Sequence, residues 1–474
     1  MRNTYITTTL PYVNAEPHIG FALEIVQADT YARSRTLQGD EVFFNTGTDE
    51  HGQKIFEKAR AEAKEPQVYV DEWAEHFKTL KDTLGLMDTL HFIRTTDTHH
   101  MAAAQELWKR CEASGDIYKK DFEGLYCVGC ERFLVERDLV DEKCPIHPNL
   151  KPETVREENY FFRFSKYTDQ LHAYTLGTHI VPDTRKIEAL QFIEQGLEDF
   201  SISRKKDRMS WGVSVPGDDE HVMYVWFDAL TNYISTLGWP EDVEGTFKKF
   251  WVDSTTIQMA GKDQVRFQSL MWQAMLFSAN IKPTDLVMYH GFMTSGGQKM
   301  SKSVGNVISP AELVQEFGID AVRYFLLRHV HPFEDSDFTR ERFVESYNAG
   351  LANGLGNLVS RVMKMAEDHL DTPVQVPEWE DFGAYFKLLD VYQFSDACDM
   401  VWAEIAECDL SIQETQPFKV IKIDPEKGRA LIAELIVKLY RIGRMLNPLM
   451  PTTSRIIKEA VKTNKKPENL FVRK

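Results

Sequence analysis

Residues 291–306 read GFMTSGGQKMSKSVGN, and they decide which fold this chain is expected to adopt. Lys299 and Lys302 stand three positions apart, between the pair Gly296-Gly297 and Gly305. Glycine permits backbone angles that other residues resist, and the head of a lysine is a compact charge on a flexible stem. The stretch therefore predicts a mobile loop that closes on a polyanion such as a triphosphate. A solvated basic turn is the alternative.

A second stretch, near the N-terminus, has the pattern of a strand, a turn and a helix. Residues 5–10, YITTTL, are mostly β-branched or aromatic and predict a buried strand. A turn rich in Pro and Asn follows, and from His18 onward the apolar residues recur at helical spacing. This arrangement favours an anion site at the start of the helix, with Gly20 leaving room for a base or ribose. An ordinary capping or surface histidine is the alternative.

The two stretches together resemble the H-I-G-H and K-M-S-K-S signatures of class I aminoacyl-tRNA synthetases. The second signature is complete at residues 299–303, whereas the first matches at three of its four positions because Phe21 replaces the second histidine. The resemblance implies that His18, Lys299 and Lys302 are catalytic. It also implies that ATP contacts these three residues together with Gly20 and Ser301.

Length and composition set limits on the kind of protein. The 474 residues suffice for two to four domains, and 43% hydrophobic with 27% charged residues is ordinary for a globular protein. Because there is no apolar run of 18 residues and the chain begins directly with a strand pattern, we expect a cytoplasmic protein without a membrane span. The net charge of -17 argues against a nucleic-acid partner when taken alone, but it does not exclude a local basic surface.

The order of elements predicts an α/β protein. Strand patterns alternate with helical patterns, which indicates a Rossmann-like parallel sheet, and we expect residues 70–115 to be helical. From about residue 340 the pattern changes to long amphipathic helices, which indicates a helix bundle. With the resemblance, these patterns imply five parts: the first half of the catalytic fold (1–96), a connective insert (97–223), the second half of the fold (224–290), a lysine-loop linking domain (291–345) and a helical anticodon-binding domain (346–474).

Three of the six cysteines and one histidine form a pair of knuckles inside the expected insert. The pattern C-x2-C followed, after 13 intervening residues, by C-x2-H offers three thiolates and an imidazole, a set that suits tetrahedral zinc. Four protein ligands close the coordination shell, so we expect one structural zinc ion per chain. Four unrelated buried residues are the alternative. The ligands would be Cys127, Cys130, Cys144 and His147.

Two further runs narrow the resemblance to methionyl-tRNA synthetases: G-T-D-E-H-G at 47–52 and Y-V-W-F-D-A at 224–229. Asp49 follows a strand and would contact the amino group of methionine, although a helix cap is the alternative. Trp226, Ala229 and Tyr233 fall on one face of an expected helix, a pattern that otherwise indicates core. A thioether packs well against aromatic rings. The resemblance implies a methionine pocket made of Leu10, Tyr12, Asp49, Trp226, Ala229 and Tyr233, with Gln264 and Gln268 departing from the family pattern.

The expected helix bundle contains the run N-L-V-S-R, which puts Asn357 and Arg361 on one face of a helix. An amide and a guanidinium can contact base edges, and surface decoration is the alternative. In methionyl-tRNA synthetases such a run recognises the anticodon together with a tryptophan. The corresponding residue here is Phe418, which keeps a ring on which an unpaired base can stack.

The resemblance covers the whole chain in order. It implies a methionine–tRNA ligase that joins methionine and ATP into methionyl-adenylate and pyrophosphate, then transfers methionine to the 3′-terminal ribose of tRNA(Met). Mg²⁺ accompanies ATP, and we expect a monomer. Three alternatives remain: a catalytically silent tRNA-binding paralogue, a class I synthetase for isoleucine, valine or leucine, and the cysteine-using branch. The insert is too short for an editing domain, and four zinc ligands leave no position for a substrate thiol.

Overall fold

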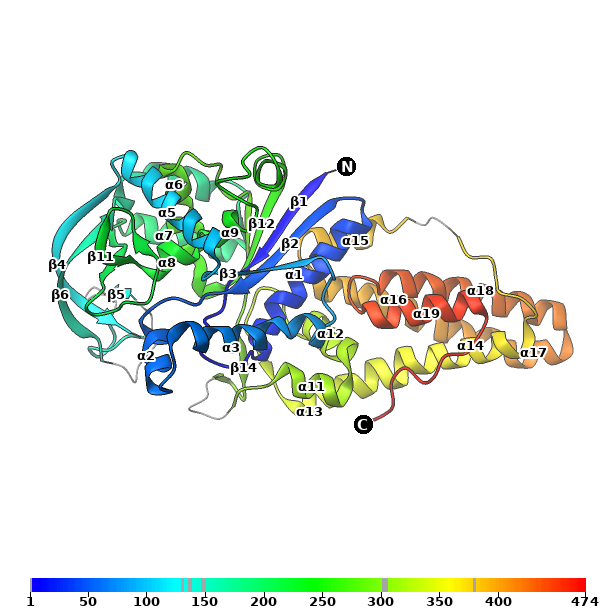
Figure 1. Cartoon of the computed structure of the whole chain (residues 1–474). Helices are drawn as coiled ribbons and strands as arrows, with labels where there is room; N and C mark the ends of the chain where they lie inside the picture. The colour runs from blue at the N-terminus through cyan, green and yellow to red at the C-terminus, as the bar shows by residue number, and fades with distance from the viewer. Residues whose placement is uncertain (1, 129–131, 135–138, 146–150, 301–305, 378–380) are drawn as a thin grey trace. The chain divides into compact units, whose positions relative to one another are not determined.

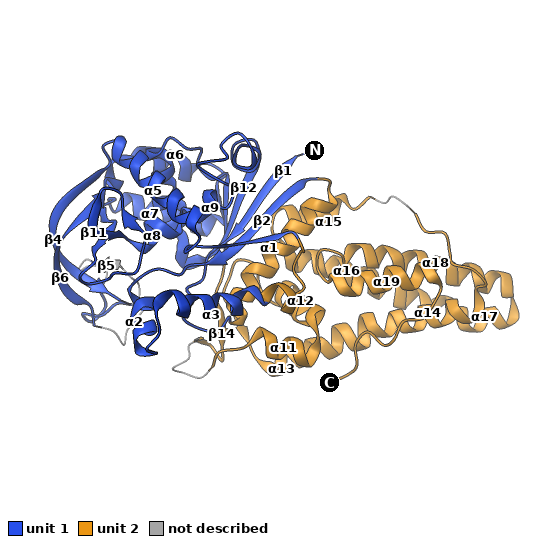
Figure 2. Cartoon of the chain, viewed as in Figure 1, with its two compact units in different colours: residues 1–17, 40–79, 89–289 blue, residues 18–39, 80–88, 290–474 orange. Residues whose placement is uncertain are grey.

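The computed structural model describes residues 2–128, 132–134, 139–145, 151–300, 306–377 and 381–474 (Figure 1). The contacts divide the chain into two compact units, coloured in Figure 2. Unit 1 comprises residues 1–17, 40–79 and 89–289, and unit 2 comprises residues 18–39, 80–88 and 290–474. Each unit is therefore assembled from three separate segments of the sequence.

A six-stranded sheet forms the centre of unit 1 (Figure 1). Its strand order is β3-β2-β1-β12-β13-β7, and the pairs β1–β2, β1–β12, β2–β3 and β13–β7 are parallel. The predicted α/β fold is confirmed. The strands are β1 (Asn3–Thr8), β2 (Glu41–Thr48), β3 (Leu90–Arg94), β7 (Ile180–Val181), β12 (Thr255–Gly261) and β13 (Leu286–His290).

The first strand is buried because its side chains are apolar or hydrogen-bonded on both faces. Tyr5 and Ile6 have no exposed surface, and the ring of Tyr5 contacts those of Phe43 on β2 and Trp251 at 5.8 and 6.0 Å. The core that contains Tyr5 extends to Trp108. That residue belongs to α5 (Thr98–Ala113). A strand buried on both faces is expected at the centre of a parallel sheet.

The predicted insert contains two antiparallel sheets together with α5, α6 (Thr168–Leu176) and α7 (Asp183–Glu194). One has the order β5-β4-β6-β8 and the other the order β10-β11-β9. The stretch 97–223 also supplies the edge strand of the main sheet, since β7 pairs with β13. The strands are β4 (Ile117–Cys127), β5 (Arg132–Leu134), β6 (Glu153–Phe162), β8 (Phe200–Ser201), β9 (Ser203–Lys205), β10 (Ser214–Val215) and β11 (Asp218–Met223).

Two local predictions were wrong. Residues 70–115 are not uniformly helical, because β3 lies between α3 (Pro66–Lys78) and α5 and pairs with β2 at the edge of the sheet. The helix expected to carry Trp226 through Tyr233 is interrupted: α8 (Val225–Ala229) and α9 (Asn232–Ser235) are separated by a turn at residues 230–231. Both errors arose where sheet pairing or a local turn overrode helical periodicity.

Unit 2 is mainly helical, and its last part is the predicted bundle, in which α18 packs against α14, α16, α17 and α19. Leu351, Leu355, Leu358 and Val362, which recur at helical spacing, are all buried. The helices are α1 (Ile19–Leu37), α11 (Pro310–Phe317), α12 (Ile319–Arg328), α13 (Arg340–Ser346), α14 (Asn357–His369), α15 (Gly383–Asp390), α16 (Phe394–Thr415), α17 (Pro417–Ile423), α18 (Pro425–Met445) and α19 (Pro451–Thr463).

A buried ion pair joins α1 to α12 inside unit 2. Arg323 Nη2 donates to Asp29 Oδ2 at 2.7 Å, and neither side chain has exposed surface. Arg323 also donates to the carbonyl groups of Leu84, Pro448 and Leu449. The guanidinium thus connects segments that lie far apart in the sequence. Within the described ranges, no helix is both long enough and apolar enough to cross a bilayer.

Candidate active site

The carboxyl ends of β1 and β2 bring together two residues of the predicted methionine pocket. Tyr12 and Asp49 form a parallel bridge: Asp49 N donates to Pro11 O at 3.0 Å, and Val13 N donates to Asp49 O at 3.3 Å. Asp49 is 2% exposed, and Tyr12 is half-buried. Ligand sites in parallel sheets lie at this end of the strands.

An aromatic wall continues from Tyr12. Its ring lies 6.2 Å from that of Trp226 in an edge arrangement, and Trp226 stacks on Phe267 with centroids 3.9 Å apart and ring planes at 17°. Phe267 was not among the predicted pocket residues, although it lies between the two glutamines that depart from the family pattern. The structure thus joins Asp49, Tyr12 and Trp226. Leu10 is half-buried and Ala229 is buried.

Gln268 contacts the last predicted pocket residue. Its Nε2 donates to the hydroxyl of Tyr233 at 2.6 Å, and both residues are buried. Within the described part of unit 1, Trp226 Nε1 and the side-chain oxygens of Gln264 and Gln268 are buried without a hydrogen-bond partner. Buried polar atoms are normally satisfied by protein, water or ligand. This region is therefore suited to hold a ligand with polar groups.

A buried carboxylate between two imidazoles connects the run at 47–52 with the run at 224–229. Asp228 Oδ2 lies 2.7 Å from His51 Nδ1, and Asp228 Oδ1 lies 3.0 Å from His100 Nε2. His100 Nδ1 in turn lies 2.9 Å from Ser235 Oγ. Burial raises the pKa of Asp228, but the charge and hydrogen bonds of the two histidines outweigh it and lower the pKa to about 2.

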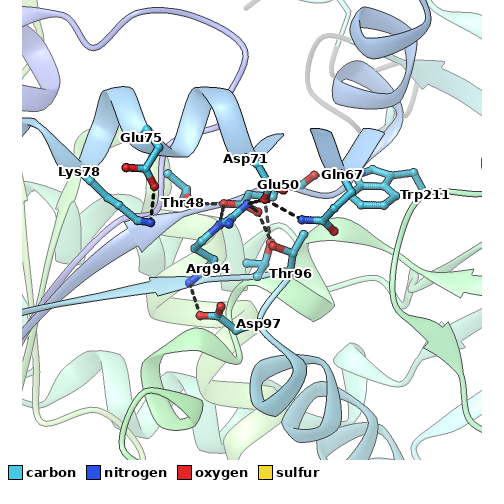
Figure 3. Close-up of polar contacts among 11 residues, drawn as sticks. Thr48, Glu50, Gln67, Asp71, Glu75, Lys78, Arg94, Thr96, Asp97 and Trp211 are labelled. Atoms are coloured by element: carbon cyan, nitrogen blue, oxygen red, sulfur yellow. Dashed lines mark hydrogen bonds and ion pairs between the residues drawn. The ribbon is translucent and has the colours of Figure 1, made fainter. Parts of the chain in front are cut away.

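Glu50 anchors a second buried network, shown in Figure 3. Its carboxylate accepts hydrogen bonds from Arg94, Thr48 and Thr96. Glu50, His51 and Asp228 were not among the predicted site residues, although all three lie within the two runs quoted for the resemblance. Nothing in the local sequence singles out Arg94, because its partners come from distant parts of the chain.

His18 forms the N-cap of α1 in unit 2. Its Nδ1 accepts a hydrogen bond from Gly20 N at 3.0 Å, and the side chain is exposed. A Cβ at position 20 would lie 2.9 Å from two atoms of the imidazole ring, so glycine is needed for this cap. The predicted helix start is confirmed. The room that Gly20 provides is occupied by the His18 ring of the same chain.

The lysine stretch begins as a β-hairpin of unit 2. Strands β14 (Met293–Ser295) and β15 (Gln298–Lys299) pair in antiparallel register around Gly296 and Gly297, whose φ angles are +62° and +73°. A two-residue hairpin turn with positive φ at both positions favours glycine. Asp337 Oδ1 accepts from Thr294 Oγ1 and Gly297 N, and these hydrogen bonds lower its pKa. Ser301 and Lys302 lie outside the described residues.

Two of the four predicted zinc ligands belong to the described residues. Cys127, at the end of β4, and Cys144 are 1% and 0% exposed and lie in one small cluster with Leu134. Cys130 and His147 lie outside the described residues. Among the described residues, no three potential metal ligands lie together, and only two members of the predicted motif belong to these residues. Two buried thiols in one cluster fit a metal site.

The predicted anticodon residues lie on α14 and α17, both of which pack against α18. Asn357 is exposed at the start of α14, and Phe418 on α17 has 43% of its surface exposed. Arg361 Nη1 donates to Asp409 Oδ1 at 3.0 Å. The amide of Asn357 and the ring of Phe418 are therefore exposed to a partner. Arg361 could contact a base only by releasing the carboxylate of Asp409 or by binding both.

Comparisons with known proteins identify related sequences and structures. The family model described as class I tRNA synthetases (M) matches residues 4–151 and 138–363. A methionine–tRNA ligase of Caldanaerobacter subterraneus subsp. tengcongensis is 40% identical over 468 residues, which cover 95% of this chain and 72% of the relative. One from Thermosynechococcus vestitus is 45% identical over 476 residues, which cover 95% and 88%.

Solved structures agree with the sequence relatives. A crystal structure of Mycobacterium tuberculosis methionyl-tRNA synthetase bound by methionyl-adenylate superimposes with a TM-score of 0.91 at 34% identity and covers 100% of both chains. A second structure of that enzyme in complex with methionyl-adenylate gives a TM-score of 0.90 at 36% identity and covers 96% of this chain and 93% of the other.

Proposed function

The chain belongs to the methionine–tRNA ligases of class I, and on that premise we propose which of its residues carry each part of the reaction. The overall reaction is activation of L-methionine by ATP to methionyl-adenylate and pyrophosphate, followed by transfer of methionine to tRNA. The observation that carries the assignment of residues is the cluster of Asp49, Tyr12 and Trp226 at the carboxyl ends of β1 and β2.

Methionine binds in unit 1. The carboxylate of Asp49 holds the substrate ammonium, because a buried negative charge at the end of a strand is stabilised by a cation. Trp226, Tyr12 and Tyr233 line the space for the thioether, whose sulfur packs favourably against aromatic rings. The apolar side chains of Leu10 and Ala229 form the rest of the pocket lining.

ATP binds to residues of unit 2. His18 and the start of α1 hold phosphate oxygens with the positive end of the helix, next to Gly20. Lys299, Ser301 and Lys302 of the K-M-S-K-S run bind the departing pyrophosphate, and ATP carries Mg²⁺. The methionine carboxylate attacks the α-phosphorus in line, so the residues contribute placement and stabilisation of charge on pyrophosphate.

A structural zinc ion is held by Cys127, Cys130, Cys144 and His147. The burial of Cys127 and Cys144 in one cluster supports the site, because thiolates that bind zinc are enclosed by their own small domain. The zinc stabilises this part of the insert and takes no part in the chemical steps. In the helical domain, Asn357, Arg361 and Phe418 contact the anticodon of tRNA(Met). The monomeric state and the domain limits at residues 97, 224, 291 and 346 also remain predictions.

Methionine-dependent exchange of pyrophosphate into ATP tests these roles by separating binding from chemistry. Trp226→Ala should raise the KM for methionine by about tenfold while leaving the KM for ATP unchanged, because the ring contributes to ground-state binding. Lys302→Ala should lower kcat far more than it changes the KM for methionine, because the lysine acts on charge that develops during reaction. A Lys302→Ala enzyme with only a raised methionine KM would refute its role.

A further inference from the structure

Both carboxylate oxygens of the buried Glu50 side chain accept two hydrogen bonds each. Oε1 accepts hydrogen bonds from Thr48 Oγ1 at 2.6 Å and Arg94 Nε at 2.7 Å. Oε2 accepts from Arg94 Nη2 at 2.8 Å and Thr96 Oγ1 at 2.5 Å. Figure 3 shows these contacts converging on one carboxylate, which has no exposed surface. A bidentate guanidinium fixes the orientation of a carboxylate as well as its charge.

The backbone of Glu50 is held as firmly as its side chain. Its N–H donates to Thr95 Oγ1 at 2.9 Å, and its carbonyl oxygen accepts from the indole Nε1 of Trp211 at 2.7 Å. The residue that follows, His51, lies against Asp228. Because Asp49 is the residue immediately before Glu50, a shift of the Glu50 backbone moves the Asp49 carboxylate as well.

Stability alone does not require such a network. A buried ion pair replaced by apolar groups of similar volume is often neutral or stabilising, so its presence next to a binding residue calls for another explanation. Binding sites depend on supporting residues that hold the contacting side chains in place. The charge of the Glu50 carboxylate is compensated inside the protein, since Arg94 Nε lies 2.7 Å from Glu50 Oε1.

We propose that Arg94 is a positioning residue: it fixes Glu50 and thereby places the carboxylate of Asp49 for the ammonium group of methionine. This inference rests on the proposed role of Asp49. It predicts that Arg94 affects only that part of the binding free energy which depends on the substrate ammonium. Loss of a residue with a merely structural role would weaken the binding of all ligands of the pocket by a similar factor.

The test compares two ligands in a set of variants of the full chain. L-methionine and 4-(methylsulfanyl)butanoate share the thioether and the carboxylate, but the second lacks the amino group. The dissociation constant of each is measured by calorimetry. Arg94→Met should weaken methionine binding by about 10- to 100-fold, the range known for loss of a residue that orients a metal ligand, and change binding of the deamino analogue by no more than about twofold. Asp49→Asn should show the same selectivity.

Milder variants keep the test decisive if Arg94→Met does not fold. Thr96→Val removes one of the four hydrogen bonds to Glu50 with little change of volume, and it should weaken methionine binding by about three- to fivefold without affecting the analogue. Arg110→Met is the matched control, since Arg110 pairs with Glu106 at 3.1 Å on α5 and contacts none of these residues. It should leave both dissociation constants unchanged.

Three results would overturn the inference. The first is equal weakening of both ligands by Arg94→Met and Thr96→Val, which indicates general disruption. The second is a selective effect of Asp71→Asn without one of Thr96→Val, because Arg94 Nη2 also donates to Asp71 Oδ1 at 2.6 Å and would then act through α3. The third is an Asp49→Asn variant that binds methionine as tightly, relative to the deamino analogue, as the parent does. That last result contradicts the role of Asp49 itself, whereas the first two contradict only the role of Arg94.

Discussion

The pair of imidazoles around Asp228 makes a quantitative prediction about stability. Asp228 has no exposed surface and lies 2.7 Å from His51 Nδ1 and 3.0 Å from His100 Nε2. Its pKa falls from 3.8 to about 2, and a difference of almost two units corresponds to about 2.5 kcal/mol in favour of the charged form. Asp228→Asn removes the charge and should therefore lower the free energy of unfolding of the protein by about 2–3 kcal/mol at pH 7.

The sign of the pH dependence follows from the lowered pKa. The stabilisation is complete above the unfolded value near 4 and is lost as the pH falls through about 2. At pH 5, one unit above the unfolded value, the Asp228→Asn variant should therefore still show a deficit in the free energy of unfolding. Urea denaturation followed by tryptophan fluorescence measures it, because seven of the nine tryptophans belong to unit 1.

A matched control separates this effect from a general loss of negative charge. Asp219 is exposed, so Asp219→Asn should change the free energy of unfolding by less than about 0.5 kcal/mol. The reasoning fails if Asp228→Asn is as stable as the parent at pH 7, or if the two variants lose stability equally. A deficit that appears at pH 7 and vanishes at pH 5 would also contradict it, because it would place the responsible titration on another group.

Four further predictions concern individual parts of the site. Cys144→Ser should reduce the zinc content measured by atomic absorption and make the insert sensitive to proteolysis, since bound zinc contributes folding free energy. Phe418→Ala should weaken tRNA(Met) binding in a filter assay by about 1–3 kcal/mol while leaving pyrophosphate exchange unchanged, because only base stacking is lost. Gly20→Ala should displace the His18 ring from its position as the N-cap of α1. This change should lower the free energy of unfolding by about 1 kcal/mol and raise the KM for ATP. Tyr233→Phe leaves the buried Gln268 amide without its partner, so the free energy of unfolding in urea should fall by about 1–3 kcal/mol.

The sequence predicted the features that depend on local pattern. The strand at residues 5–10, the helix that begins after His18 and the C-terminal bundle each have a clear periodicity, and the structure has strand β1, helix α1 and the bundle at these places. The strand β3 was missed because five residues between two helices carry too short a pattern to compete with their surroundings. Its partner β2, distant in sequence, determines its conformation.

The buried contacts around Glu50 and Asp228 could not be predicted from the sequence for a related reason. Arg94 is 44 residues from Glu50 and 23 from Asp71, and His100 is 128 residues from Asp228. No spacing rule relates such positions. Two glycine positions show the same limit at shorter range. The stretch with Gly296 and Gly297 was predicted as a mobile loop, and the structure puts both glycines in the turn of a β-hairpin. The reason for Gly20 became visible only with the His18 ring beside it.

The assignment as a methionine–tRNA ligase is tested most directly by the exchange of labelled pyrophosphate into ATP with one amino acid added at a time. The purified chain with ATP and Mg²⁺ should catalyse exchange when methionine is added and should remain at background with isoleucine, valine, leucine or cysteine. Binding of tRNA(Met) without methionine-dependent exchange would contradict the account and identify the chain as a catalytically silent relative.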